Sequence, residues 1–228
     1  MLRRHFVILL AVLTLCFFAG TTWTAARAQS VPEKIEWTWA DRPEHPDPSL
    51  PNVLLLGDSI TRGYYPETVR LLAGHANCYL FATSASSGDP RLPKQIAAYS
   101  DIAPPAFAVI HFNNGMHGWA YTEQQYNNGL PSQISALRQL APHATLIWAT
   151  ITPVLKADDG GATNPRIDER NRLALALMQQ QHIAIDDQHT LMLDHQNLHQ
   201  GNIHFTTAGS AIQAQQAAQS ILKLLFQR

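Results

Sequence analysis

Ser59 is the first residue of this chain whose type and position could support nucleophilic chemistry. It follows a short apolar run, residues 53–56, that is stopped by Gly57 and Asp58. Such a run predicts a strand that is buried on both faces of a parallel sheet. Ligands of open α/β sheets bind outside the carboxyl ends of the strands, so the Ser59 hydroxyl is expected where a substrate would bind. The plainer interpretation is that Ser59 only caps a following helix.

Two later positions carry groups that could stabilise negative charge on an oxygen atom. Gly88 lies in a stretch of small and polar residues, 83–89, and offers a main-chain N–H that no side chain shields. Asn113 follows an apolar run, 107–112, and an amide donor at the end of a strand suits an oxyanion hole. The plainer interpretations are a flexible loop at Gly88 and an ordinary Asn-Asn-Gly turn at Asn113.

Four blocks of the sequence resemble, in the same chain order, the four blocks of the SGNH or GDSL-type hydrolases. The blocks are GDSI at 57–60, SSGD at 86–89, HFNN at 111–114 and HFTTAG at 204–209. The resemblance implies that Ser59 is the nucleophile and that His204 is its general base. It also implies an oxyanion hole made by the N–H groups of Ser59 and Gly88 and by the side chain of Asn113. It covers residues 52 to about 226.

Two of these blocks depart from the family pattern. The third block has Asn114 where the family has Asp, so either Asn113 or Asn114 could be the oxyanion donor, and we favour Asn113. Before the fourth block, Gly201 stands where the family has an Asp three residues ahead of the histidine. Either a main-chain carbonyl or Asp194 would then orient His204. His117, in the loop after Asn113, either touches substrate or lies at the surface.

The order of the remaining segments predicts the fold class. Apolar runs expected to be strands alternate with segments of helical periodicity, which is typical of βαβ units and a parallel sheet. The expected strands are 53–56, 78–82, 107–112, 144–150 and 182–185, and the expected helices are 66–73, 122–140, 166–181 and 211–225. The family resemblance implies a three-layer α/β/α sandwich, flavodoxin-like, with a five-stranded parallel sheet. Residues 52–228 would form this hydrolase domain.

The first 51 residues divide into two segments. Residues 1–28 have the arginine pair, apolar stretch and Ala-Arg-Ala site of a signal peptide, so we expect an exported protein that begins near Gln29. An uncleaved membrane anchor is the alternative, but the apolar stretch is shorter than the ~20 residues that span a bilayer. Residues 29–51 are rich in Pro and charge and predict an extended arm. Trp37 and Trp39 in this arm either stack on a sugar or pin the arm to the domain.

Composition excludes some classes of function. Cleavage of the signal would lower Lys plus Arg from 16 to 13 against 17 acids, a net charge of −4 that offers no footprint for nucleic acid. Cys78 would be the single cysteine left, so no intrachain disulfide is expected. His195 and His199 have a spacing that could hold Zn²⁺ on a helix, but no partner acid or cysteine matches it. We expect no metal and no cofactor.

The resemblance implies hydrolysis of an ester through an acyl-enzyme on Ser59. Exported members of the family often act on acylated carbohydrates, so a small-molecule or glycan ester is the expected substrate. Two alternatives remain open at this point. The altered blocks could mark an inactive relative that binds acylated glycans, or the same Ser-His pair could transfer the acyl group to a sugar. The sequence does not indicate the oligomeric state.

Overall fold

The computed structural model describes residues 29–104, 106–157 and 160–227, so the predicted signal peptide lies outside the described residues. Its centre is a six-stranded sheet in the order β1-β3-β2-β4-β5-β6, and a two-stranded hairpin pairs β7 with β8. The strands are β1 Thr38–Asp41, β2 Asn52–Gly57, β3 Asn77–Thr83, β4 Val109–Phe112, β5 Thr145–Ala149, β6 Ala184–Asp186, β7 His199–Gln200 and β8 His204–Phe205.

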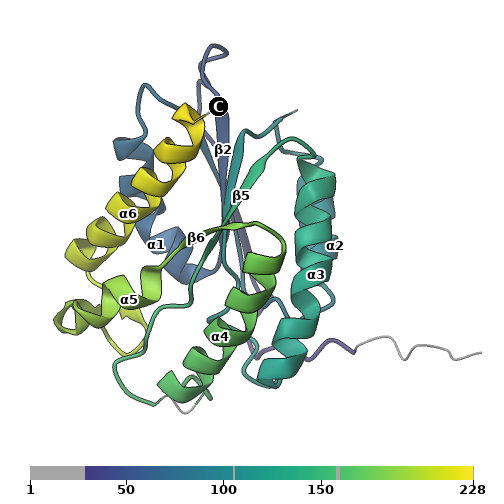
Figure 1. Cartoon of the computed structure of the whole chain (residues 1–228), viewed down its shortest axis with the longest axis vertical. Helices are drawn as coiled ribbons and strands as arrows, with labels where there is room; N and C mark the ends of the chain where they lie inside the picture. The colour runs from purple at the N-terminus through teal and green to yellow at the C-terminus, as the bar shows by residue number, and fades with distance from the viewer. Residues whose placement is uncertain (1–28, 105, 158–159, 228) are drawn as a thin grey trace, which may run out of the picture.

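Helices cover both faces of the sheet and give three layers (Figure 1). One face carries α1, α5 and α6, and the other carries α2, α3 and α4. The helices are α1 Ser59–Leu71, α2 Leu92–Tyr99, α3 Glu123–Leu140, α4 Asn164–Gln180, α5 Gln188–Leu193 and α6 Thr207–Phe226, with a 3-10 turn at Gln196–Leu198. The three-layer arrangement expected from the sequence is confirmed.

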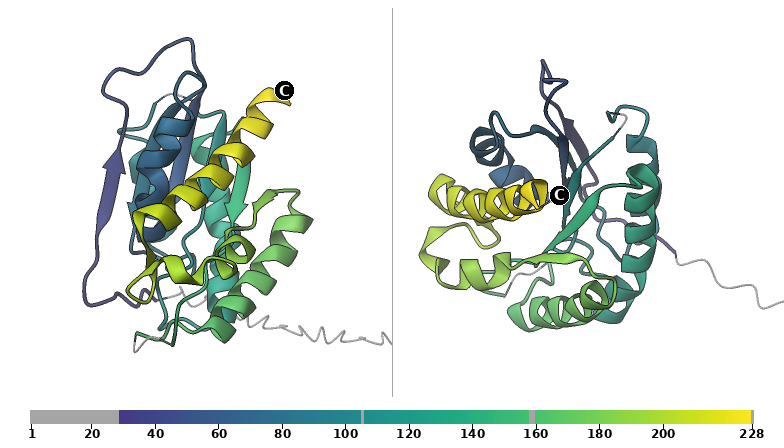
Figure 2. Two further views of the ribbon diagram at one scale, coloured as in Figure 1. Left: turned by 90° about the vertical axis from the view of Figure 1, so that its left-hand side faces the viewer. Right: turned by 45° about the horizontal axis from the view of Figure 1, so that its top comes forward.

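The sheet has six strands in place of the predicted five, because the N-terminal arm supplies β1. This strand lies at the edge of the sheet, antiparallel to β3, whereas the other five strands are parallel (Figure 2). The sequence of β1 does not predict a strand, because all four of its side chains are exposed and apolar and polar residues do not alternate along it in the way typical of a half-buried strand. Backbone pairing holds it in place, and the N–H of Ser84 continues the pairing to Trp37 O at 3.1 Å.

Local capping explains why several helices begin where they do. The Asp58 side chain accepts the N–H of Ile60, so α1 begins at Ser59 and not near Pro66 as the sequence suggested; Pro66 lies inside the helix. The Thr122 side chain and Gln125 form a capping box at the start of α3. The Thr206 side chain caps α6 by accepting the N–H of Gly209.

Burial in the strands explains the central position of the sheet. Every residue of β3 and of β4 is buried, and so are five of the six residues of β2. Strands covered on both faces read as continuous apolar runs, which is why these three were predictable. Helix α6 turns Ala214, Ala217 and Ile221 toward the core on one stripe. The sheet is therefore a rigid base from which the loops at its carboxyl edge project.

Candidate active site

Ser59 occupies the first position of α1, directly after β2. The turn is tight because Gly57 has no side chain: a Cβ there would lie 2.0 Å from Thr61 Oγ1 and 2.7 Å from Asn113 O. Asp58 then fixes both sides of the turn, accepting the N–H of Ile60 at 3.0 Å and the N–H of Met116 at 3.1 Å. The first N–H groups of a helix have no partner within it, so the main chain at Ser59 presents positive charge beside the hydroxyl.

His204 meets Ser59 from the far end of the chain. Its Nε2 lies 2.9 Å from Ser59 Oγ, although 145 positions separate the two residues. His204 begins β8, and the hairpin that carries it turns at Gly201, whose φ of +75° favours glycine. Phe205, the next residue, is buried and packs on the His199 ring with centroids 4.3 Å apart. The structure thus brings the predicted nucleophile and the predicted base into hydrogen-bond contact.

Asp194, one of the two groups expected to orient His204, forms no hydrogen bond with that imidazole among the described residues, and its role stays a prediction. Asp194 is exposed at the C-terminal end of α5, and within the described residues no ion pair joins a carboxylate to His204. Before His204 the chain forms α5, the 3-10 turn and the β7–β8 hairpin. The N–H of Thr206 donates to Leu198 O at 2.8 Å and closes this hairpin region.

Gly88 and Asn113 do not line the cavities that contain Ser59. Gly88 lines a separate cavity of about 250 Å³ together with Tyr121 and Gln125. The Asn113 amide donates to the carbonyl of Ala149, and its side-chain oxygen accepts the N–H of Gly115 at 2.8 Å. The oxyanion roles expected for Gly88 and Asn113 remain predictions, and Asn113 would have to leave Ala149 to fulfil its role.

Asn114, the other candidate donor, also has both ends of its amide bonded. Its nitrogen donates to Gly57 O at 2.9 Å, and its oxygen accepts from Gln133 Nε2 at 3.0 Å. Asn114 is 1 % exposed. It links the turn before Ser59 to helix α3 and is placed to stabilise the turn.

The open space beside Ser59 is a cleft with one wall built by the N-terminal arm. Two cavities of about 410 and 420 Å³ share the residues Ser59, His117 and His204. The arm contributes residues 31–34 to the first cavity and Trp37 to the second. The arm predicted from sequence is therefore part of the candidate site. Of its two tryptophans, Trp37 lines the cleft, whereas Trp39 is 50 % exposed and lies against the Arg62 guanidinium.

His117 has a carboxylate partner from this arm. Its Nδ1 lies 2.9 Å from Glu33 Oε2, and Glu33 Oε1 accepts the N–H of Gly118 at 2.8 Å. Burial alone would lower the pKa of His117, but the bond to Glu33 together with the negative charges of Asp58, Glu33 and Glu36 outweighs burial and raises that pKa. Burial likewise would raise the pKa of Glu33, yet its bonds to His117 and Gly118 hold it below the ordinary value. Both shifts favour an imidazolium–carboxylate pair.

Arg170 holds the loop that carries His117. This fully buried guanidinium donates to the carbonyl oxygens of Gly115, His117, Gly118 and Tyr121 at 2.9 to 3.3 Å. Burial lowers the pKa of Arg170 to about 10, so it stays cationic at neutral pH. Sequence reasoning missed this residue, because an arginine within an amphipathic helix usually points to solvent.

A second residue that sequence reasoning did not single out for function is the core histidine His111. Its Nε2 lies 2.7 Å from Asp186 Oδ2, and neither side chain is exposed. Gln188 and Gln216 also donate to the Asp186 carboxylate. The sequence feature that could have drawn attention to His111 is its position as a histidine inside the otherwise apolar run 107–112. Within the described residues, no group of three or more His, Cys, Asp or Glu side chains is arranged to hold a metal ion.

The chain belongs to the GDSL-like Lipase/Acylhydrolase family, which it matches over residues 55–212. This confirms the resemblance seen in the four blocks and identifies a hydrolase that acts on ester bonds. No curated protein matches the chain. In the part of the chain that the structure describes, no helix is long and apolar enough to cross a membrane.

Solved structures share the fold at low sequence identity. A lipolytic protein of the G-D-S-L family from Veillonella parvula is 19 % identical, with a TM-score of 0.60 over 74 % of this chain and 96 % of that one. A carbohydrate esterase of family 3 from Talaromyces cellulolyticus is 15 % identical, with a TM-score of 0.63 over 78 % and 100 %. The C-terminal catalytic domain of peptidoglycan O-acetyltransferase A from Streptococcus pneumoniae is 16 % identical, with a TM-score of 0.57 over 77 % and 94 %.

Proposed function

We propose that this protein is an exported serine esterase that removes a small acyl group, such as acetyl, from a carbohydrate ester. The observation that carries the proposal is the 2.9 Å contact between Ser59 Oγ and His204 Nε2 at the open cleft. A hydroxyl at a helix N-terminus with an imidazole in hydrogen-bond reach is the arrangement that nucleophilic catalysis requires.

The reaction follows from these two groups. His204 accepts the Ser59 proton while Oγ forms a bond to the ester carbonyl carbon, and the carbonyl electron pair moves onto oxygen. The tetrahedral intermediate collapses, the ester C–O bond breaks, and the alcohol leaves with the proton from His204. Water, deprotonated by the same imidazole, then hydrolyses the acyl-Ser59 ester and regenerates the hydroxyl.

Replacement of Ser59 tests the nucleophile. Ser59→Ala should abolish both turnover of p-nitrophenyl acetate and labelling by a fluorophosphonate probe, because among the described residues that line the cleft no other hydroxyl contacts a base. Ser135→Ala, an exposed serine on α3, is the matched control and should behave as wild type. Labelling that persists in Ser59→Ala would show that the nucleophile lies elsewhere.

The carbohydrate part of the proposal is supported by the shape of the cleft and by two structural neighbours. Trp37 and Trp119 line the two cavities and offer aromatic surface on which a sugar ring can pack. The neighbours described as a carbohydrate esterase and a peptidoglycan O-acetyltransferase have the same fold. A panel of acetylated and longer-chain esters of sugars and simple alcohols tests it. A preference for long-chain lipids over acetylated sugars would reject this substrate class.

Acyl transfer is the second candidate, favoured by the structural neighbour that is an O-acetyltransferase and by the open cleft beside Ser59. In this reaction a sugar hydroxyl replaces water in the second half. Adding an acceptor sugar to the p-nitrophenyl acetate assay distinguishes hydrolysis from acyl transfer, because a transferase forms acetylated sugar in place of acetate. An inactive binding module would give neither product.

Export rests on the first 28 residues, whose composition is that of a cleaved signal. We propose that the mature chain starts near Gln29 and works in the periplasm or outside the cell. N-terminal sequencing of protein recovered from outside the cytoplasm tests this. Recovery of a chain that still begins with Met1 would reject cleavage.

A further inference from the structure

The candidate active site contains a second histidine whose role the Ser59–His204 pair does not explain. His117 lines both cavities that Ser59 and His204 line, and its side chain is 19 % exposed. Its Nδ1 is engaged by Glu33, so Nε2 is the ring nitrogen left for a ligand. The neighbouring Trp37 ring meets the imidazole edge-on, with centroids 5.8 Å apart, and limits its rotation.

Ester attack requires a donor for the oxygen that becomes negative, and two amides near the site are bonded elsewhere. Asn113 donates to Ala149 O, and Asn114 donates to Gly57 O. Moving either amide into the cleft would leave a buried carbonyl without its donor, which costs about 1–3 kcal/mol. His117 requires no such rearrangement, because its ring already borders the cleft.

The groups around His117 favour a ring that carries two protons. Glu33 accepts from Nδ1, and Asp58 and Glu36 add negative charge from the turn before α1 and from the arm. Two cations also lie in this region: Arg170 binds the main-chain oxygen of His117, and Arg62 lines one of the two cavities that contain His117. A protonated imidazole in this field has an N–H at Nε2 that can donate to a developing oxyanion.

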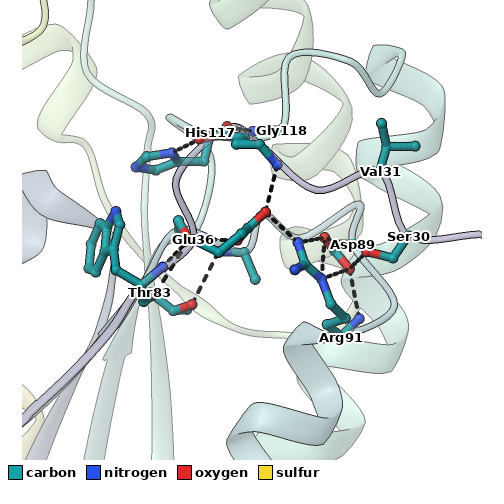
Figure 3. Close-up of polar contacts among 12 residues, drawn as sticks. Ser30, Val31, Glu36, Thr83, Asp89, Arg91, His117 and Gly118 are labelled. Carbon is teal, nitrogen blue, oxygen red and sulfur yellow. Dashed lines mark hydrogen bonds and ion pairs between the residues drawn. The ribbon is translucent and has the colours of Figure 1, made fainter.

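Polar contacts among Glu36, Arg91, Asp89 and Ser30 fasten the arm beside Glu33 (Figure 3). The N–H of Glu33 donates to Glu36 Oε1 at 2.6 Å, and the same oxygen accepts from Arg91 at 2.8 Å. Arg91 also pairs with Asp89, which accepts the hydroxyl of Ser30 at 3.1 Å. The arm is thus fastened on both sides of Glu33, so the carboxylate reaches His117 from a fixed position.

We propose that His117 donates a hydrogen bond from Nε2 to the carbonyl oxygen of the scissile ester as Ser59 attacks, and that Glu33 is the positioning residue that orients the ring. This inference rests on the proposed esterase function. His117 keeps its protons throughout: the Ser59 proton moves to His204 and leaves on the alcohol. His117 supplies only the hydrogen bond that strengthens as the carbonyl oxygen gains charge.

The first experiment separates binding from catalysis with p-nitrophenyl acetate. His117→Ala should lower kcat by about 10²–10³-fold with KM changed less than about threefold, because the bond strengthens in the transition state. His117→Gln, which retains an amide donor, should recover part of that loss. A kcat within threefold of wild type in His117→Ala, or a change confined to KM, would overturn the proposal. So would a hundredfold loss in Asn113→Ala without one in His117→Ala.

The second experiment tests Glu33 through the pH profile of kcat/KM. Because Glu33 raises the pKa of His117, the protonated ring is present below that pKa and is lost as pH rises through it. Glu33→Gln should therefore move the alkaline fall in activity to lower pH. Glu36→Gln, the comparison variant, removes a charge near His117 and an arm contact to Arg91 but keeps the bond from Glu33 to His117, so it should move the alkaline fall in activity less than Glu33→Gln does. Equal pH profiles of kcat/KM for Glu33→Gln and Glu36→Gln would show that Glu33 only fastens the arm, and would overturn its assigned role in orienting His117.

Failure of this inference is distinguishable from failure of the proposed function. Wild-type protein that neither reacts with a fluorophosphonate nor hydrolyses any ester would reject the esterase itself. Wild-type protein that is labelled and active, with His117→Ala equally active and equally stable to heat, would reject only the role of His117.

Discussion

His111 Nε2 and Asp186 Oδ2 lie 2.7 Å apart in the interior of the protein, where neither side chain is exposed. Burial by itself would raise the pKa of the Asp186 carboxyl, but hydrogen bonds from His111, Gln188 and Gln216 outweigh burial and hold that pKa below its ordinary value. The pair fastens β4 to β6 and to α6, because Gln216 belongs to that helix.

Removing the carboxylate should therefore destabilise the fold. Asp186→Ala is expected to lower the free energy of unfolding by about 3–5 kcal/mol at neutral pH, since it leaves His111 buried without its partner. The depressed folded pKa contributes stability above the unfolded value of about 3.9 and loses it as pH falls through the folded value. Urea unfolding of wild type and Asp186→Ala at pH 7 and pH 3 measures both free energies of unfolding. The difference between the two proteins should be smaller at pH 3 than at pH 7. A loss below about 1 kcal/mol at pH 7 would contradict the prediction.

His204 should depend little on Asp194. His204→Ala is expected to remove nearly all activity, because it deprives Ser59 of its base. Asp194→Ala should cost less than about tenfold in kcat/KM, against the ~10⁴ loss when a true triad carboxylate is neutralised. The carboxylate is exposed and forms no ion pair with His204 within the described residues. A thousandfold loss in a folded Asp194→Ala protein would show that this acid reaches the imidazole during the reaction.

The contact between Ser59 and His204 could be predicted because each residue belongs to a short sequence block with a fixed place in the chain order. Strands β2, β3 and β4 were predictable because both faces are buried and their sequences read as apolar runs. These patterns are local in the sequence, so they can be recognised without knowledge of the tertiary structure.

The contacts that complete the cleft had no such signal. Glu33 and His117 are 84 positions apart, and neither residue type nor spacing marks them as partners. Strand β1 is exposed on all four side chains and is held by main-chain pairing, which any sequence can make. The start of α1 was placed too late because Pro66 resembles a first-turn proline, whereas the Asp58 cap sets the start at Ser59.

Arg170 should be essential for the loop that carries His117. Arg170→Met leaves up to four buried carbonyl groups without their donor, and each unsatisfied group costs about 1–3 kcal/mol. We expect a loss of unfolding free energy of at least about 3 kcal/mol. Arg170→Lys should rescue little, because an ammonium cannot reproduce the planar fork of donors. Chemical denaturation monitors both variants, and near wild-type stability of Arg170→Lys would contradict the reasoning.

Asn113 should matter more for stability than for turnover. Its amide joins the end of β4 to Ala149 O and to the N–H of Gly115. Asn113→Ala is expected to lower the melting temperature while kcat falls less than about tenfold, well short of the 10²–10³ typical of a lost oxyanion donor. Thermal melting and steady-state kinetics on one preparation distinguish the two effects. An unchanged melting temperature with a hundredfold lower kcat would instead assign Asn113 to the oxyanion hole.

The placement of His204 in β8 has a consequence for the chain during its synthesis. The nucleophile, the arm and the loop with His117 are all complete once residue 121 has been made, and β1 can pair with β3 from residue 83 onward. The base that meets Ser59 arrives 145 residues after it, just ahead of the final helix that packs on α1. A chain that ends before His204 therefore lacks the base of Ser59, so esterase activity can begin only when synthesis of the protein is nearly finished.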